Sequence, residues 1–276
     1  MKFKKISIIG VGFMGGSLAL ALKKSYTNSC IWGYARSKKS FKKLKKLKIT
    51  DVVSSDLKEL VSNSDIVILA MPVLTIIDYF KKIAPFLKKG AIVIDLGSTK
   101  KLIEKEAKKH LPRYVHFVGS HPLCGSNKGG PENAIKNLYK DSVCIITSRN
   151  NSVKLVATLW KRLGAKVCTM DAALHDRILS YVSHLPHVIS YSLSLSVPSK
   201  FMPFASRSFS DITRISLSPP DSWADIFLSN KKHITNNIDE YIRILELFKD
   251  LIKSGDRKSI VKLIKKINLK HKRKIN

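Results

Sequence analysis

The chain has 276 residues, 44% of them hydrophobic, which is enough to bury one large core or two smaller ones. Its formal net charge of +30 raises the question of nucleic-acid binding. The cations are mostly lysines, scattered along the chain without interleaved aromatic residues, so we expect a solvated lysine-rich surface and no nucleic-acid site. We find no signal peptide and no apolar run of membrane-spanning length, which predicts a cytoplasmic protein. None of the four cysteines has C-x-x-C spacing, so no metal site is expected.

Short apolar runs alternate with helix-like segments through the first half of the chain. The runs are continuous, which indicates parallel strands that are buried on both faces. This order predicts an α/β domain over residues 1–170, a Rossmann-type doubly wound parallel sheet. The expected strands are Ile6–Ile9, Cys30–Tyr34, Ile66–Met71, Ala91–Leu96, Val115–Gly119, Val143–Thr147 and Ala165–Thr169.

The pattern changes to helices in the second half. Asp171 can cap a helix that continues to the region of Pro186. Apolar residues recur at helical spacing through Ile234–Ile252, whereas the Pro- and Ser-containing stretch Ser196–Ser208 is expected to be a loop. The sequence therefore predicts an all-helical C-terminal domain over residues 171–276.

One face of the long helix predicted in this domain is strongly apolar. Its residues Ile238, Ile242, Leu245 and Phe248 exceed what a domain of about 100 residues needs for its own core. We therefore expect the C-terminal domain to form a homodimer.

A glycine motif, G-x-G-x-x-G, follows the first predicted strand and opens the first predicted helix. Gly10 permits the tight turn, Gly12 lets a pyrophosphate approach the backbone, and Gly15 lets the helix pack against the strand. Phe13 and Met14 stand at the helix N-terminus, where free N–H groups favour phosphate. This context predicts a dinucleotide-binding site, over the alternative of a glycine-rich turn without a ligand.

The ribose-binding position is unusual. About 20 residues beyond the glycine motif, an NAD enzyme should have a carboxylate for the ribose 2′-hydroxyl. This chain has Arg36 and Ser37, with Lys38 and Lys39 behind them, and these residues could hold a 2′-phosphate. The pattern favours NADP over NAD, unless Arg36 is one more surface cation.

Several short motifs then follow in an order that is similar to the prephenate and arogenate dehydrogenases, from about Lys4 to the region of Ile238. The resemblance implies oxidative decarboxylation of prephenate to 4-hydroxyphenylpyruvate in tyrosine biosynthesis, with hydride transfer to NAD(P), or of arogenate to tyrosine. It also implies a homodimer. The motifs are Gly97–Lys100, Gly119–Ser126, His175–Arg177, Ser183–His187, Asp211–Arg214 and Trp223–Phe227.

The resemblance implies roles for individual residues. His121 would accept a hydrogen bond from the substrate 4-hydroxyl and assist hydride transfer, as a neutral imidazole can. Ser98 would touch the nicotinamide end and His121, although it could also cap the following helix. Ser126 corresponds to a hydroxyl that contacts substrate. Cys124, three residues after His121, could be a nucleophile, but nothing else in the sequence supports covalent catalysis.

The second half would supply the remaining substrate contacts. The resemblance places His184 and His187 facing the cleft, although His184 is equally consistent with a buried core histidine. Arg214 would bind a substrate carboxylate, with Asp211 one turn earlier as its orienting partner. The alternative for Asp211 and Arg214 is a structural ion pair.

The chain departs from the family pattern at Ala205–Ser210, where a glycine-rich run is usual and no glycine stands here. Because that loop shapes the side-chain end of the pocket, the choice between prephenate and arogenate stays open. A different two-domain hydroxyacid dehydrogenase would instead carry a catalytic lysine in the helical domain and lack the S-H-L-P-H motif. A non-catalytic basic binding protein would ignore nicotinamide and bind DNA with a steep salt dependence.

Overall fold

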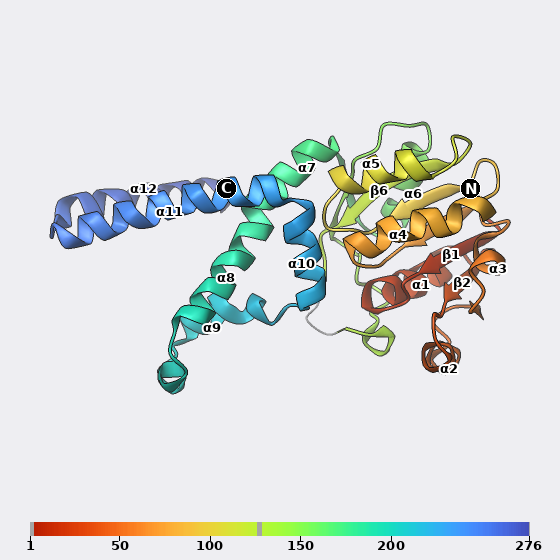
Figure 1. The fold of residues 1–276 in the computed structure, drawn as a ribbon, viewed down its shortest axis with the longest axis horizontal. Helices are drawn as coiled ribbons and strands as arrows, with labels where there is room; N and C mark the ends of the chain where they lie inside the picture. The colour runs from red at the N-terminus through yellow and green to blue at the C-terminus, as the bar shows by residue number, and fades with distance from the viewer. Residues whose placement is uncertain (1–2, 126–128, 276) are drawn as a thin grey trace. The chain divides into compact units, whose positions relative to one another are not determined.

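The computed structural model describes residues 3–125 and 129–275 (Figure 1). They form two compact units, residues 1–230 and residues 231–276. The larger unit holds all eight strands and the helices as far as α10. Within the described ranges, no helix is both long and apolar enough to cross a membrane.

The strands form one sheet in the order β3-β2-β1-β4-β5-β6-β7-β8. The chain adds β2 and β3 on one side of β1 and then returns to place β4 on its other side. Open α/β sheets bind ligands at such a switch point, beyond the carboxyl ends of the strands. The strands are β1 (Lys5–Ile9), β2 (Cys30–Tyr34), β3 (Val52–Ser54), β4 (Ile66–Leu69), β5 (Ile92–Asp95), β6 (His116–Pro122), β7 (Val143–Ile146) and β8 (Lys166–Thr169).

The predicted doubly wound fold is confirmed, with two local differences. Strand β3 was not predicted, because three residues are too few to stand out as an apolar run. Strands β6 and β7 pair antiparallel, whereas the other neighbours are parallel. The described part of the connection between them holds the short 3₁₀-helix η2 (Pro131–Asn133) and turns but no α-helix, whereas a parallel pair needs a crossover that is usually helical.

The sheet separates two apolar clusters. Within β4, Ile66 and Ile68 belong to one cluster and Val67 and Leu69 to the other, which explains why this strand is apolar at every position. Helices α1 and α6 cover the first cluster and α3, α4 and α5 the second. The helices of this part of the chain are α1 (Phe13–Ser25), α2 (Lys38–Leu47), α3 (Leu57–Val61), α4 (Val73–Ile83), α5 (Lys101–His110) and α6 (Val153–Arg162).

The C-terminal part of the chain is helical, as predicted. Asp171 begins α7 by accepting a hydrogen bond from the backbone N–H of Leu174 at 2.8 Å. The elements are α7 (Ala172–Leu179), a π-helical turn (Ser180–His184), α8 (Leu185–Ser196), η4 (Ser199–Phe204), α9 (Arg207–Thr213), η5 (Arg214–Leu217), α10 (Pro220–Ser229), α11 (Lys231–Lys253) and α12 (Arg257–Ile275).

Two of these helical segments differ from the expectation. The helix that begins after Asp171 is not uniform, because the π-helical turn interrupts it, and such turns concentrate at functional sites. Ser196–Ser208, expected to be a loop, contains the 3₁₀-helix η4 and the start of α9. The smaller unit consists of α11 and α12 side by side (Figure 1), and it includes the predicted helix Ile234–Ile252.

Candidate active site

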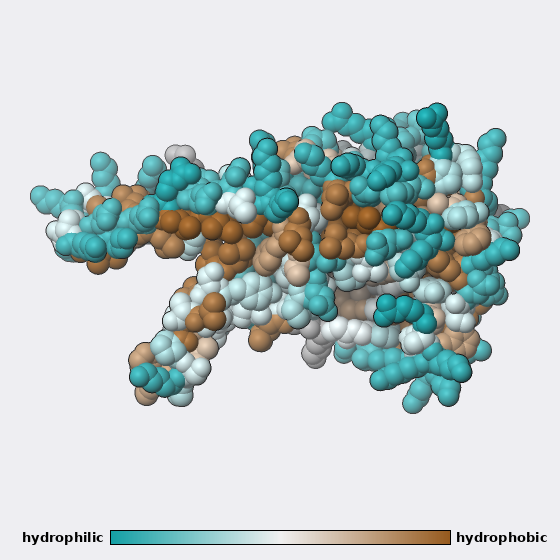
Figure 2. All heavy atoms as spheres, viewed as in Figure 1, coloured by the Kyte–Doolittle hydropathy of each residue, from teal (hydrophilic) through white to brown (hydrophobic). Residues whose placement is uncertain are grey.

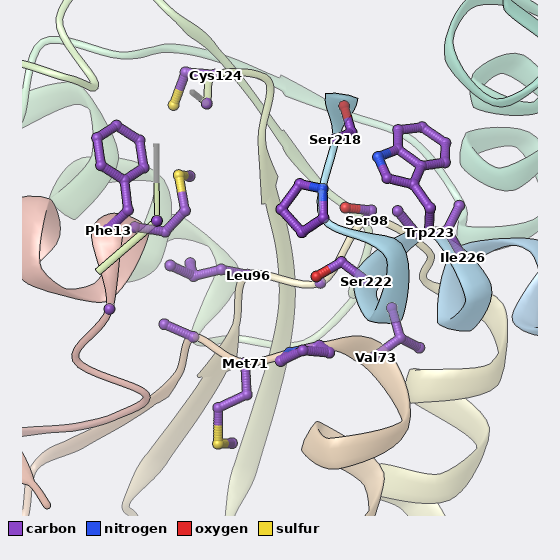
Figure 3. Close-up of a pocket in the computed structure, with 18 of the residues that line it drawn as sticks. Phe13, Met71, Val73, Leu96, Ser98, Cys124, Ser218, Ser222, Trp223 and Ile226 are labelled. Atoms are coloured by element: carbon purple, nitrogen blue, oxygen red, sulfur yellow. The ribbon is translucent and has the colours of Figure 1, made fainter. Parts of the chain in front are cut away.

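A cavity of about 790 Å³ lies within the larger unit, at the carboxyl ends of the central strands. Figure 3 shows Phe13 and Cys124 on one side of this cavity and Ser98, Ser222 and Trp223 on the other. Segments from both halves of the chain therefore share one site. The sequence-predicted residues that line it are Gly12, Phe13, Met14, Ser98, His121, His187 and Arg214.

The glycine turn has the geometry of a phosphate cradle. Gly10 has a φ of +92°, and a Cβ there would lie 2.4 Å from the carbonyl oxygen of Ala70. A Cβ on Gly15 would lie 2.2 Å from the carbonyl oxygen of Gly10, so the close packing of α1 requires glycine. A Cβ on Gly12 would meet nothing within 4 Å, because this backbone faces the open cavity. The N-cap residue of α1 is Gly12, which has no side chain to cap the helix, and this leaves the helix N-terminus to a ligand.

A second cavity, of about 660 Å³, adjoins the same glycine turn and leads to the end of β2. Arg36 and Ser37 line it, together with Lys39 and Lys43. The Ser37 hydroxyl caps α2, accepting a hydrogen bond from the Ser40 N–H at 3.1 Å. The described lining residues include no Asp or Glu, so this cavity has the charge expected for binding an anion.

His121 is the first member of a hydrogen-bonded chain. Its Nδ1 lies 2.9 Å from Nε2 of His175, and Nδ1 of His175 lies 2.8 Å from Oδ1 of Asp176. His175 and Asp176 are buried, whereas the His121 ring reaches the cavity. Burial holds the pKa of His121 well below its ordinary value, and the charges of the neighbouring His175, Lys100 and His184 lower it further. A neutral His121 can therefore present an acceptor nitrogen to the cavity.

Asp176 links this chain to the sheet. Its carboxylate accepts the backbone N–H groups of Lys100 at 2.8 Å and Lys101 at 3.0 Å, and thereby caps α5 from another element. Burial alone would raise the pKa of Asp176, but hydrogen bonds from His175 and these two N–H groups outweigh it and lower the pKa. Asp176 therefore remains an ionised carboxylate.

A buried ion pair lies beneath the site. The Lys100 ammonium is fully buried and contacts the Asp95 carboxylate, and it also donates to the Ser120 carbonyl at 2.9 Å. Burial raises the pKa of Asp95, against the opposing effect of Lys100. Because Ser120 precedes His121 and Lys100 follows Ser98 closely, this pair holds together the two strand ends that carry the predicted catalytic residues.

His184 has the buried environment that was one of its two interpretations. Only 1% of the residue is exposed, its Nδ1 accepts from the Asn230 side-chain amide at 3.2 Å, and its ring packs edge-on against Trp223. Burial lowers the pKa of His184 to about 4. His184 also lines a smaller cavity together with Ser98 and His121.

His187 lies flat against Trp223, with ring centroids 3.4 Å apart and planes inclined by 21°. Its Nδ1–H donates to the Ser183 carbonyl at 2.9 Å, which leaves Nε2 as an acceptor toward the Ser218 hydroxyl at 3.5 Å. Burial lowers the pKa of His187. The ring is therefore neutral and held in one orientation, and it lines the main cavity.

Arg214 and Asp211 are not brought together as expected. Arg214 begins η5 and lines the main cavity, where it is the one cationic residue among the described lining. Asp211 is exposed and faces Arg207, one turn earlier in α9, with 3.9 Å between Nε and Oδ2. Arg207 and Asp211 stand four residues apart within α9, a spacing that brings two side chains to the same face of a helix, whereas α9 ends at Thr213 before Arg214. Ser126 lies outside the described residues.

Several residues of the site were not predicted from the sequence. His175, Asp176 and Trp223 stood in the motifs, yet no pattern indicated that His175 would meet His121 from 54 positions away. Lys100 was part of G-S-T-K, and its complete burial was not predicted. Asn230 carried no signal, because a single Asn at a helix end has many possible roles.

Comparison with known proteins gives one consistent result. Residues 18–169 match the family model described as prephenate dehydrogenase, nucleotide-binding domain, and residues 171–266 match prephenate dehydrogenase, dimerization domain. The chain is 32% identical to cyclohexadienyl dehydrogenase of Zymomonas mobilis, over 92% of this chain and 90% of that one. It is 31% identical to prephenate dehydrogenase of Bacillus subtilis, over 94% and 73%.

The solved structures agree. The crystal structure of prephenate dehydrogenase from A. aeolicus in complex with hydroxyphenyl propionate and NAD+ superposes with a TM-score of 0.90 at 31% identity, covering 98% of both chains. Synechocystis arogenate dehydrogenase has the same fold, with a TM-score of 0.80 at 24% identity.

Proposed function

Because this chain belongs to the prephenate dehydrogenase family, we propose that it catalyses the oxidative decarboxylation of prephenate to 4-hydroxyphenylpyruvate, with NAD(P) as hydride acceptor, in tyrosine biosynthesis. One observation carries the proposal: the uncapped glycine turn, the acceptor nitrogen of His121 and the guanidinium of Arg214 line a single cavity. We assign cofactor binding to residues 1–170, and substrate binding with dimerisation to residues 171–276.

The residues of the glycine turn fit a dinucleotide. Gly12 offers its backbone to open space and α1 presents an uncapped N-terminus, which together suit a pyrophosphate. Gly10, Gly12, Phe13, Met14 and Gly15 would hold it there. When bound, the nicotinamide supplies the hydride acceptor.

The 4-hydroxyl end of the substrate is assigned to His121 and Ser98. A neutral His121 can accept the hydroxyl proton as hydride leaves the same carbon, so its hydrogen bond strengthens toward the transition state. Ser98 lies at the end of β5 and lines the same two cavities as His121. Loss of CO₂ then makes the ring aromatic, which drives the reaction.

The carboxylate end is assigned to Arg214, with His187 and His184 as neutral walls. A guanidinium can bind a carboxylate through two parallel hydrogen bonds, and within residues 3–125 and 129–275 Arg214 forms no ion pair that would compete. Asp211, which pairs with Arg207, would act only indirectly. Ser126 remains proposed as a hydroxyl contact on the strength of the motif alone.

The lining favours prephenate over arogenate. Prephenate carries a keto group where arogenate carries an ammonium, and a desolvated ammonium needs a carboxylate partner. No Asp or Glu occurs among the described lining residues of the main cavity or its smaller neighbour, and positions 126–128 are Ser, Asn and Lys. The Ser222 hydroxyl can instead donate a hydrogen bond to a keto oxygen.

The second cavity favours NADP over NAD. Arg36, Lys39 and Lys43 bring positive charge to the end of β2, where NAD enzymes place a carboxylate. Lys43 is already paired with Glu132 at 2.7 Å, so Arg36 and Lys39 are the cations available to a 2′-phosphate.

The test is cofactor reduction, followed at 340 nm, with prephenate and arogenate each combined with NAD and NADP. We expect the highest kcat/KM with prephenate and NADP. No reduction in any of the four combinations would refute the proposed function. A tenfold preference for arogenate would overturn only the substrate assignment, and a preference for NAD only the cofactor assignment.

A further inference from the structure

The hydrogen-bonded chain behind His121 has a definite direction. Asp176 is an ionised carboxylate that accepts two backbone N–H groups, so the ring nitrogen of His175 facing it must carry the hydrogen. A neutral His175 then offers Nε2 as an acceptor, and His121 must donate to it through Nδ1. It follows that Nε2 of His121 carries the free lone pair that the proposed reaction needs.

We propose that His175 is a positioning residue and proton acceptor behind His121, so that the proton released by the substrate hydroxyl ends on His175, beside Asp176. This inference rests on the proposed function. The hydroxyl proton binds Nε2 of His121 as the Nδ1 proton of His121 passes to Nε2 of His175. His121 exchanges one tautomer for the other and stays neutral, while His175 becomes an imidazolium.

The charges around the two rings support this division. His121 faces His175, His184 and the buried ammonium of Lys100, so a positive charge on its own ring is disfavoured, in line with its lowered pKa. His175 instead contacts the Asp176 carboxylate at 2.8 Å and is fully buried. Asp176 thus stabilises an imidazolium at the one place where the buried chain can hold it.

The other ionisable groups near the chain do not displace this arrangement. The Lys100 ammonium contacts the Asp95 carboxylate and the Ser120 carbonyl, and among the described residues it hydrogen-bonds with neither ring. The Glu104 carboxylate accepts a hydrogen bond from the Thr147 hydroxyl at 2.5 Å and not from either histidine ring. The carboxylate in hydrogen-bonding contact with either ring is therefore that of Asp176.

A first test uses the unmodified protein and does not depend on turnover. Two-dimensional ¹⁵N–¹H NMR of the histidine rings reports which nitrogen of each neutral ring carries hydrogen. We expect hydrogen on Nδ1 of both His121 and His175 at neutral pH, with the assignments made by loss of signals in His121→Asn and His175→Gln. Hydrogen on Nε2 of His121 would overturn the proposal, whatever the substrate proves to be.

A second test separates positioning from proton transfer. His175→Gln keeps an acceptor for Nδ1–H of His121 but cannot be protonated near neutral pH. We expect kcat to fall by about 10²–10⁴, the usual contribution of acid–base catalysis, while KM changes less than threefold. A purely structural role for His175 would instead change KM and kcat together.

The matched control is His110→Gln, which removes a histidine paired with Glu106 at the end of α5 and outside the cavities described above. It should retain the parental kcat. A kcat for His175→Gln within threefold of the parent would overturn the proton-accepting role. If the parent turns over neither prephenate nor arogenate, the proposed function fails, and the NMR test still decides the direction of the chain.

Discussion

Nδ1 of the buried His184 accepts a hydrogen bond from the side-chain amide of Asn230, and the same amide group donates to the backbone carbonyl of Asp176 at 2.8 Å. Asn230 thus connects the π-helical turn with α7 from the end of α10. A single amide satisfies two buried acceptors, and it does so only while His184 is neutral.

The first prediction follows from this contact. The pKa of His184 is about 4 in the fold and near 6.5 in an unfolded chain, so the unfolded chain binds the extra proton first as pH falls. Stability linked to His184 is therefore present above pH 6.5 and lost between about pH 6.5 and 4. At pH 5 the loss should be about 2 kcal/mol relative to pH 7, from the same pKa difference.

Urea unfolding at pH 7 and pH 5 measures this loss. His184→Gln keeps the size of the side chain but removes the titration, so the pH dependence of its unfolding free energy should be smaller than that of the parent by that amount. An equal dependence in both proteins would show that His184 does not titrate as its burial requires.

The second prediction concerns His121→Asn. The variant loses the ring nitrogen that accepts the hydroxyl proton, while the site keeps Arg214 for binding. We expect kcat to fall by at least about 10²-fold and KM for substrate to change little, because the lost hydrogen bond acts mainly in the transition state. Steady-state kinetics decide the matter, and an effect confined to KM would assign His121 to binding alone.

The third prediction concerns Arg214→Ala. Losing the guanidinium should weaken binding in the ground and transition states alike, by about 2–4 kcal/mol if the pair is desolvated. KM should then rise by about 30-fold to several hundred-fold with a smaller change in kcat. Arg207→Ala is the matched control, because Arg207 is exposed and pairs with Asp211 instead. A similar rise in KM for both variants would mean that general charge, and not Arg214, attracts the substrate.

The fourth prediction concerns Arg36→Asp. The change removes a cation from the cavity at the end of β2 and adds an acceptor for a ribose 2′-hydroxyl, so preference should shift from NADP towards NAD. Lys42→Asp makes the same change of charge on α2 without lining that cavity. The ratio of kcat/KM values for the two cofactors should move in the first variant alone, and a parent that uses both equally would count against the assignment.

The fifth prediction is a homodimer built through the C-terminal helices. Figure 2 shows apolar side chains along α11 and α12, and Ile242 and Leu245 are 46% and 50% exposed in the single chain. Such a surface favours a self-complementary contact. Light scattering at micromolar concentration should give twice the mass of the 31.0 kDa chain, and Leu245→Glu should reduce it. A monomeric parent would refute the prediction.

Local patterns in the sequence determined much of this protein. Continuous apolar runs identified the long strands of the sheet, and G-x-G-x-x-G located its ligand-binding turn, because both are properties of neighbouring residues. His121 and Arg214 were found through motifs for the same reason. The short β3 was missed because it is only three residues long. The strand β7 was expected, but its antiparallel pairing was not, since pairing direction depends on how a connection returns and not on the strand itself.

Tertiary structure alone decided which distant groups meet. The contact from His121 to His175 spans 54 positions, and the Asp176 carboxylate that caps α5 comes from a helix more than 70 residues further along the chain. Asp211 pairs with Arg207, although its position in the sequence suggested Arg214. Burial of Lys100, His175 and His184 sets their charge environment, and burial is a property of the packed fold. The direction of the hydrogen-bonded chain behind His121 therefore depends on how α7 packs against the sheet and not on any motif.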